Sequence, residues 1–122
     1  MKKVILIEDE PALQESLSIA LKSKGIDVIS AFDGESGLNL IIKMKPDLIL
    51  LDLILPKMDG FTILDNVKKN PEVNNIPIIV LTNLDDDRYI QRVIGLGVTS
   101  YLIKSNYNSE EISNKVKDIL KI

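Results

Sequence analysis

The sequence contains no cysteine and no histidine among its 122 residues. Histidine is the commonest general base and transition-metal ligand, and it is the usual partner of a catalytic serine or cysteine. The absence of both residues excludes these chemistries, and disulfide cross-links, as the chain's own work. A bound metal must therefore be held by oxygen atoms, which favours Mg²⁺, Ca²⁺ or Mn²⁺ over Zn²⁺ or Cu²⁺.

A strong charge of one sign and long apolar runs are also absent. Fifteen Lys and Arg residues oppose eighteen Asp and Glu residues, and no basic stripe stands out, so we expect no direct contact with nucleic acid. No apolar run approaches the roughly 18 residues that span a membrane, and the start Met1-Lys2-Lys3 leads into too short an apolar run for a signal peptide. We therefore expect a cytoplasmic protein without membrane contact.

The chain does have enough apolar residues for a core of its own. Hydrophobic residues make up 45% of the sequence, and a chain of this size buries roughly two-thirds of its unfolded surface. No linker, repeat or low-complexity segment interrupts it. We therefore expect one domain over residues 1–122.

Five short apolar runs recur along the chain and predict β-strands. Most of them are apolar at consecutive positions, which is typical of parallel strands that are buried on both faces. The runs are residues 4–7, 28–31, 48–51, 78–81 and 101–103.

The segments between and after these runs carry apolar residues at helical spacing. Asp33 and Asp59 can cap helix starts, while Gly25 and Gly97 can end helices. The apolar faces consist of Leu13, Leu17, Ala20 and Leu21; Leu38, Ile41 and Ile42; Phe61, Leu64 and Val67; Ile90, Val93 and Ile94; and Ile112, Val116, Ile119 and Leu120. The alternation predicts an α/β fold, a three-layer αβα sandwich built as (βα)₅ around a five-stranded parallel sheet.

Polar residues follow the predicted strands at the edge where such a sheet binds its ligands. A flavodoxin-like strand order of 2-1-3-4-5 reverses direction between the first and third strands, so Asp9 and Asp52 should meet there beside Glu8. Thr82 and Lys104 end the fourth and fifth strands and should lie close by.

The charges of this cluster indicate its chemistry. Each close pair among the three carboxylates repels by about 4 kcal/mol at roughly 4 Å and an effective dielectric near 20. One Mg²⁺ ion together with Lys104 would balance the three negative charges. A phosphoryl group on Asp52 would then lie within reach of the metal, the Lys104 ammonium and the Thr82 hydroxyl, which are the groups that phosphoryl transfer requires.

These residues together resemble the response-regulator receiver domain of two-component signalling, over essentially the whole chain. The motifs that carry the resemblance are Glu8-Asp9, the run from Asp52 to Gly60 (DLILPKMDG), Thr82, and the run from Tyr101 to Lys104 (YLIK). The resemblance implies that Asp52 takes a phosphoryl group from a phosphohistidine on a sensor histidine kinase or a histidine phosphotransfer protein. It also implies a signalling switch that catalyses only its own phosphotransfer and autodephosphorylation, and not an enzyme with another substrate.

The resemblance further implies a metal site. Asp9 and Asp52 would bind Mg²⁺ directly, with Mn²⁺ as a substitute, together with the main-chain carbonyl of Ile54. Glu8 would act mostly through a metal-bound water.

The resemblance assigns the remaining residues to the phosphoryl group and to the switch. Thr82 and Lys104 would bind phosphoryl oxygens, and Tyr101 would turn inward when Thr82 moves toward the phosphate. The change would be read by a downstream protein or output domain on the surface of the fourth helix, fifth strand and fifth helix, roughly residues 85–122. The resemblance also allows a phosphorylation-dependent dimer.

Two residues depart from the family's usual pattern. Ser105 follows Lys104 where many receivers have a proline after a cis peptide bond, and a cis bond before serine would cost about 3 kcal/mol. Asn83 stands after the strand-end threonine, where a small residue is usual. The loop after Lys104 is therefore either trans or held in a strained cis form, and this sets how far Lys104 reaches. The Asn83 amide would either crowd the phosphoryl site or donate a hydrogen bond to it.

Three other functions share parts of the pattern. A flavodoxin-like FMN carrier has the same fold, but the acidic run at residues 8–10 would repel a phosphate group. A phosphatase with an aspartyl nucleophile usually has a second acid two residues on, where this chain has Ile54. The main alternative is a pseudo-receiver that is not phosphorylated and serves as a protein interaction module.

Overall fold

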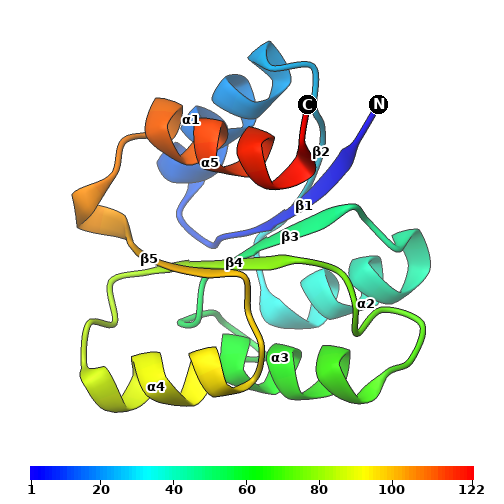
Figure 1. Cartoon of the computed structure of the whole chain (residues 1–122), viewed down its shortest axis with the longest axis vertical. Helices are drawn as coiled ribbons and strands as arrows, with labels where there is room; N and C mark the ends of the chain where they lie inside the picture. The colour runs from blue at the N-terminus through cyan, green and yellow to red at the C-terminus, as the bar shows by residue number, and fades with distance from the viewer.

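One parallel sheet forms the middle layer of the structure, a computed structural model that describes residues 1–122 (Figure 1). Its strands are β1 (Lys3–Ile7), β2 (Asp27–Ala31), β3 (Leu48–Leu51), β4 (Ile78–Thr82) and β5 (Ser100–Ile103). They are ordered β2-β1-β3-β4-β5, and every neighbouring pair is parallel. The predicted sheet and its strand order are confirmed.

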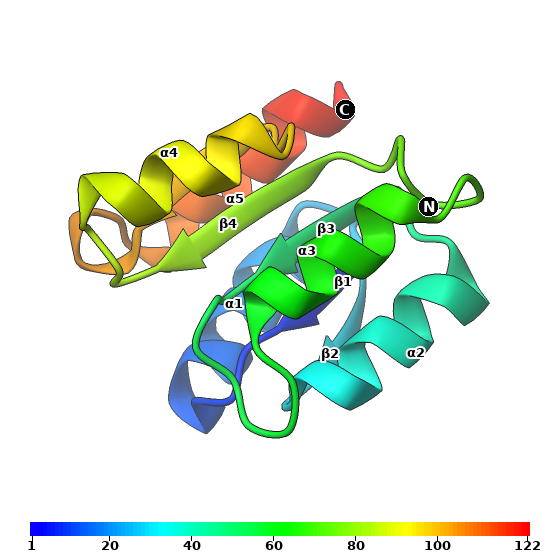
Figure 2. The same ribbon diagram turned by 90° about the horizontal axis from the view of Figure 1, so that it is seen from below.

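Helices cover both faces of the sheet and complete the three layers. One face carries α1 (Pro11–Ser23) and α5 (Ser109–Leu120), and the other carries α2 (Gly34–Met44), α3 (Gly60–Lys69) and α4 (Asp87–Gly95), as Figures 1 and 2 show. A short 3₁₀ turn, Lys104–Asn106, joins β5 to α5. No helix is both long enough and apolar enough to cross a membrane.

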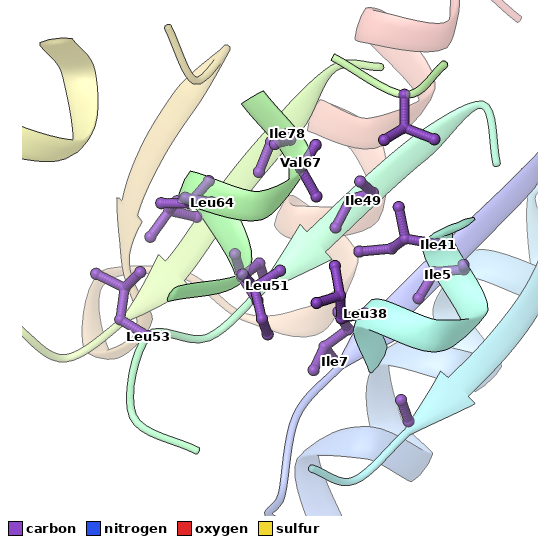
Figure 3. Packing of buried hydrophobic residues seen from close by; sticks show 14 of the residues in the cluster. Ile5, Ile7, Leu38, Ile41, Ile49, Leu51, Leu53, Leu64, Val67 and Ile78 are labelled. Carbon is purple, nitrogen blue, oxygen red and sulfur yellow. The ribbon is translucent and has the colours of Figure 1, made fainter. Parts of the chain in front are cut away.

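The three central strands hold the core, because helices cover them on both sides. Alternate residues of β1 and β3 point to opposite faces, so Ile5 and Ile49 pack with α2 and α3, whereas Leu6 and Leu50 pack with α1 and α5. Figure 3 shows the first of these two clusters, with Leu38 and other apolar side chains of α2 and α3 lying over β1 and β3.

The prediction that the strands are buried on both faces was wrong for the two edge strands, β2 and β5. Residues Asp27 and Ser30 of β2 are exposed, and Leu102 is the only buried residue of β5. Two residues assigned to apolar helix faces, Ile42 and Ile94, are also exposed. Each follows a more buried neighbour in sequence, and one residue along a helix turns the side chain by about 100°, away from the sheet.

The predicted helix caps are confirmed. The carboxylates of Asp33 and Asp59 accept hydrogen bonds from main-chain N–H groups at the starts of α2 and α3, both at 2.8 Å. Gly25 and Gly97 follow the ends of α1 and α4 with φ values of 79° and 84°, a conformation that favours glycine. These caps start α2 and α3 at the carboxyl edge of the sheet, where the polar strand-end residues lie.

Candidate functional site

The pairing of the strands brings the predicted site residues to one edge of the sheet. Ile7 pairs with Leu51, so the residues that follow them, Glu8 and Asp52, emerge side by side. The main-chain N–H of Asp52 continues this pairing by donating to the carbonyl of Ile7 at 3.1 Å. Lys104 directly follows the last pair of β4 and β5, which joins Thr82 to Ile103.

Three carboxylates meet at this edge. One oxygen from each of Glu8, Asp9 and Asp52 lies within 4.8 Å of the other two. Glu8 and Asp52 are buried, with 1% and 5% exposed, whereas Asp9 is exposed to solvent. Asp9 does not cap α1, because the N-cap residue is Glu10 and no side chain bonds to the helix start. The structure thus brings together the acidic residues that the sequence predicted and leaves Asp9 free to bind a cation.

Lys104 lies between the two buried carboxylates. Its Nζ atom is 2.6 Å from Glu8 Oε1 and 2.7 Å from Asp52 Oδ2. The Lys104–Ser105 peptide bond is trans, since the chain contains no cis peptide bond. The trans loop therefore lets Lys104 reach Asp52, which answers the question that Ser105 raised.

The site still carries more negative than positive charge. Burial raises the pKa of Glu8 above its ordinary value, even though the contact with Lys104 acts in the opposite direction. Burial also disfavours the Lys104 ammonium, but its contacts with Asp52 and Glu8 outweigh burial and raise the pKa of Lys104. Three carboxylates beside one ammonium leave two uncompensated charges when all are ionised, which one divalent cation would balance.

The donor set fits a hard divalent cation. The three clustered side chains offer carboxylate oxygens, which Mg²⁺ and Mn²⁺ accept. Glu8 Oε2 also accepts a hydrogen bond from the Glu10 N–H at 3.1 Å, which holds its carboxylate in place. The main chain at Ile54 is close to Asp52, because its N–H donates to Asp52 Oδ1 at 3.3 Å. That the Ile54 carbonyl binds the metal stays a prediction.

Thr82 and Tyr101 meet at the loop between β4 and α4. Thr82 is fully buried, and its Oγ1 atom accepts a long hydrogen bond of 3.5 Å from the Leu84 N–H. The hydroxyl of Tyr101 donates to the Leu84 carbonyl at 2.6 Å. Burial, followed by the charges of Asp52 and Asp85, raises the pKa of Tyr101, so it remains a neutral donor at pH 7. Leu84 thus links the strand-end threonine to the predicted switch residue.

The two residues that depart from the family's usual pattern contact each other. The main-chain N–H of Ser105, which a proline would lack, donates to Asn83 Oδ1 at 3.2 Å. This bond joins the loops that follow β4 and β5, next to Thr82 and Lys104. The sequence drew attention to both positions but did not reveal that they pair.

The sequence reasoning also missed Gln14 of α1. Its side chain is only 3% exposed and bonds to the main chain at the end of β1. A signal was present, because Gln14 stands three and seven residues before the buried Leu17 and Leu21 and so lies on the buried face of the helix.

Comparisons with known proteins agree on one family. The sequence model of one protein family, the response regulator receiver domain, matches residues 4–117. A relative from Synechocystis sp., the "DNA-binding dual master transcriptional regulator RpaA", is 36% identical over 121 residues, which are 99% of this chain and 50% of the relative. The "probable transcriptional regulator ycf27" of Porphyridium aerugineum is 34% identical over 98% of this chain and 48% of its own length. The chain therefore spans about half the length of these relatives.

Solved structures of receivers superpose closely on the chain. The receiver domain of the Francisella response regulator 1452 has a TM-score of 0.89 and 28% identity, covering 99% of this chain and 98% of that one. The Mn²⁺-bound form of the response regulator Rcp1 has a TM-score of 0.84 and 31% identity, covering 98% and 91%. The fold and the sequence thus lead to the same group of proteins.

Proposed function

The chain belongs to the response regulator receiver domain family, and from this premise we propose that Asp52 accepts a phosphoryl group from a phosphohistidine of a partner protein. The partner is a sensor histidine kinase or a histidine phosphotransfer protein. The observation that carries the proposal is the position of Asp52, a buried carboxylate in contact with Lys104 and surrounded by two further acids. The chain acts as a switch and catalyses only its own phosphotransfer and hydrolysis.

The chemical step is a displacement at phosphorus. A carboxylate oxygen of Asp52 attacks, the new P–O bond forms, and the bond between phosphorus and the donor's imidazole nitrogen breaks. The donor's imidazole carries a proton on its other ring nitrogen, so it keeps the electron pair of the broken bond and departs as a neutral ring. The reactive nitrogen thus belongs to the partner protein, and the chain needs no histidine of its own. Burial of Asp52 at 5% exposure limits the access of competing water to the reacting carboxylate.

Lys104 and Thr82 stabilise the charge that develops on the transferred group. Lys104 Nζ already lies 2.7 Å from Asp52 Oδ2 and can move its contact to a phosphoryl oxygen. The hydroxyl of Thr82, buried at the end of β4, supplies a neutral donor. Mg²⁺, or Mn²⁺ in its place, would be held by Asp9, Asp52 and the Ile54 carbonyl, with Glu8 acting through water, and would neutralise negative charge on the phosphoryl oxygens.

The signal leaves the site through Leu84. When the Thr82 hydroxyl turns toward the phosphoryl group, the loop that contains Leu84 moves with it, and the bond from Tyr101 to the Leu84 carbonyl transmits the movement to β5. The helix α4 begins only three residues after Leu84. A downstream protein or output domain would read the change on the surface of α4, β5 and α5.

The proposal is tested by the mass of the intact protein after incubation with acetyl phosphate. We expect the gain of one phosphoryl group when Mg²⁺ is present and no gain when EDTA replaces it. A mass that is unchanged with Mg²⁺ would contradict the proposal and favour the pseudo-receiver. A gain that is equal with EDTA would contradict the role of the metal.

A further inference from the structure

Gln14 is the one buried polar side chain bonded to the main chain of the acidic cluster to which the proposed reaction gives no task. Its Nε2 atom donates to three main-chain carbonyl oxygens, those of Leu6 at 3.0 Å, Glu8 at 3.2 Å and Ala31 at 2.9 Å. These carbonyls belong to β1, to the loop that follows it and to the end of β2. One amide on α1 therefore ties together the carboxyl ends of two neighbouring strands.

The bond to the Glu8 carbonyl bears directly on the acidic cluster. This carbonyl belongs to the peptide unit that joins Glu8 to Asp9, and a peptide unit is planar and stiff. Holding its oxygen therefore fixes the direction in which the chain leaves Glu8 and the place from which the Asp9 side chain starts. The Glu8 N–H also donates to the Ala31 carbonyl at 3.0 Å, so the same turn is anchored from both sides.

Packing alone does not account for a glutamine at this position. The Oε1 atom of Gln14 is buried without a hydrogen-bond partner, which costs about 1–3 kcal/mol. An apolar side chain on this face of α1, like those of Leu17 and Leu21, would avoid that cost. What an apolar side chain could not supply is the pair of N–H donors that the Leu6, Glu8 and Ala31 carbonyls share.

We propose that Gln14 is a positioning residue for the metal site, which braces the Glu8–Asp9 turn so that both carboxylates face Asp52. The proposal rests on the metal binding described under the proposed function. The ligands come from chain segments after β1 and β3, so their relative placement depends on how firmly the turn after β1 is held.

The variant Gln14→Met tests the brace, since methionine has a similar length and no donor. We expect the dissociation constant for Mg²⁺, from the rise of the melting temperature during a titration, to increase about tenfold. The matched control is Ser113→Ala, which removes another fully buried side chain bonded to the main chain, through Oγ to the Glu110 carbonyl at 2.8 Å on α5. It should lower stability and leave the Mg²⁺ affinity unchanged.

Hydrogen exchange separates positioning from general destabilisation. The Glu10 amide donates to Glu8 Oε2, so its exchange rate reports how firmly the Glu8–Asp9 turn is held. Without metal, this rate should be higher in Gln14→Met than in wild type, by more than the loss of global stability explains. In Ser113→Ala, the exchange rate of the Glu10 amide should change only by as much as the loss of global stability explains. A Mg²⁺ affinity within twofold of wild type, with no selective change at Glu10, would overturn the proposal.

A second measurement keeps the test decisive if Gln14→Met does not fold. In the wild-type protein, Mg²⁺ should shift the NMR signals of the Gln14 side-chain amide, while the exposed Gln91 of α4 should show no shift. Saturation with Mg²⁺ and an unchanged Gln14 signal would overturn the proposal. A wild-type protein that binds no Mg²⁺ would contradict the metal step of the proposed function. Where Gln14→Met folds, the exchange of the Glu10 amide would then still decide whether Gln14 holds the Glu8–Asp9 turn.

Discussion

At the scale of single residues, Lys104 carries the electrostatic balance of the site. It is the only cationic side chain in contact with Glu8 or Asp52, and both of these carboxylates are buried. Two buried carboxylates without a cation would repel each other and lack the water that normally stabilises them. Lys104 should therefore contribute to the stability of the metal-free protein as well as to the proposed phosphoryl transfer.

The variant Lys104→Met should lower the free energy of unfolding by about 3 kcal/mol in EDTA, because it leaves both carboxylates unpaired. Mg²⁺ should restore more stability to this variant than to wild type, since the ion replaces the missing positive charge. Urea unfolding with and without Mg²⁺ measures both effects. The control Lys117→Met removes an exposed lysine of α5 that forms no ion pair and should change little. Equal losses in the two variants would contradict this assignment.

Glu8 makes the stability of the metal-free protein depend on pH. Its pKa in the folded protein lies above the ordinary value of 4.5, chiefly because of burial, so folding favours the protonated form. The contribution of Glu8 to stability is therefore complete below pH 4.5 and is lost as the pH rises through the folded pKa.

The variant Glu8→Gln keeps a neutral side chain at every pH, so in EDTA it should melt at a higher temperature than wild type at pH 7. The difference should shrink as the pH falls toward 4.5, where Glu8 itself becomes protonated. Melting curves between these two pH values show whether Glu8→Gln raises or lowers the melting temperature. A variant that is less stable than wild type at pH 7 would show that the ion pair with Lys104 outweighs burial.

At the scale of elements, the starts of the helices hold the loops of the site. The first residue of α3, Gly60, packs directly against the loop after β3. A Cβ atom at this position would lie 2.6 Å from the main-chain oxygen of Asp52 and 2.6 Å from Cα of Leu53. Close contact between the helix and the backbone thus sets the position of the proposed phosphoacceptor.

The variant Gly60→Ala should lower the free energy of unfolding by about 1–3 kcal/mol, because it forces this backbone apart. It should also slow the uptake of a phosphoryl group, since the displaced segment includes Asp52. The matched control is Gly95→Ala at the end of α4, where an added Cβ meets nothing within 4 Å and should stabilise by up to about 1 kcal/mol. Unfolding in urea and the rate of mass gain measure the two effects, and a rate equal to that of wild type would contradict the link to Asp52.

The sequence predicted those elements whose signals are local. Consecutive apolar residues marked β1, β3 and β4, and Asp33 and Asp59 each cap a helix through an N–H only three residues away. The sequence did not predict the exposure of Ile42, because a residue beside the apolar stripe of a helix differs from its members only by a rotation of about 100°.

The sequence also did not predict contacts between distant segments of the chain. The bonds from Gln14 to the Ala31 carbonyl and from Ser105 to Asn83 join residues that are 17 and 22 positions apart. Each depends on the orientation of one side chain toward one main-chain group in the assembled fold. The acidic cluster was predictable for the opposite reason, since its residues follow strand ends that the parallel sheet necessarily brings to one edge.

At the scale of the whole molecule, the parallel topology separates the charges. All five strands run parallel, so their carboxyl ends lie at one edge. The helices run back from it, as Figure 2 shows for α2, α3 and α4. The last turn of every helix contains a basic residue, and the first turns of α2, α4 and α5 contain acidic residues. The small net charge of −3 therefore conceals an acidic end that holds the site and a basic end opposite to it.

Binding of Mg²⁺ at the acidic end should raise the melting temperature of the whole domain. At a Mg²⁺ concentration ten times its dissociation constant, mass action adds about 1.4 kcal/mol to the free energy of unfolding. NaCl at the same ionic strength should not reproduce the rise, because screening at the surface does not replace a bound ion. A scan of melting temperature in the two salts measures this, and identical curves would contradict a specific site.

The most direct test of the central claim compares wild type with Asp52→Ala and Asp65→Ala after incubation with Mg²⁺ and acetyl phosphate. Asp65 is a half-buried carboxylate of α3 outside the acidic cluster and serves as the matched control. We expect the intact masses of wild type and Asp65→Ala to increase by one phosphoryl group and the mass of Asp52→Ala to stay unchanged. An equal gain in all three proteins would show that Asp52 is not the phosphoacceptor.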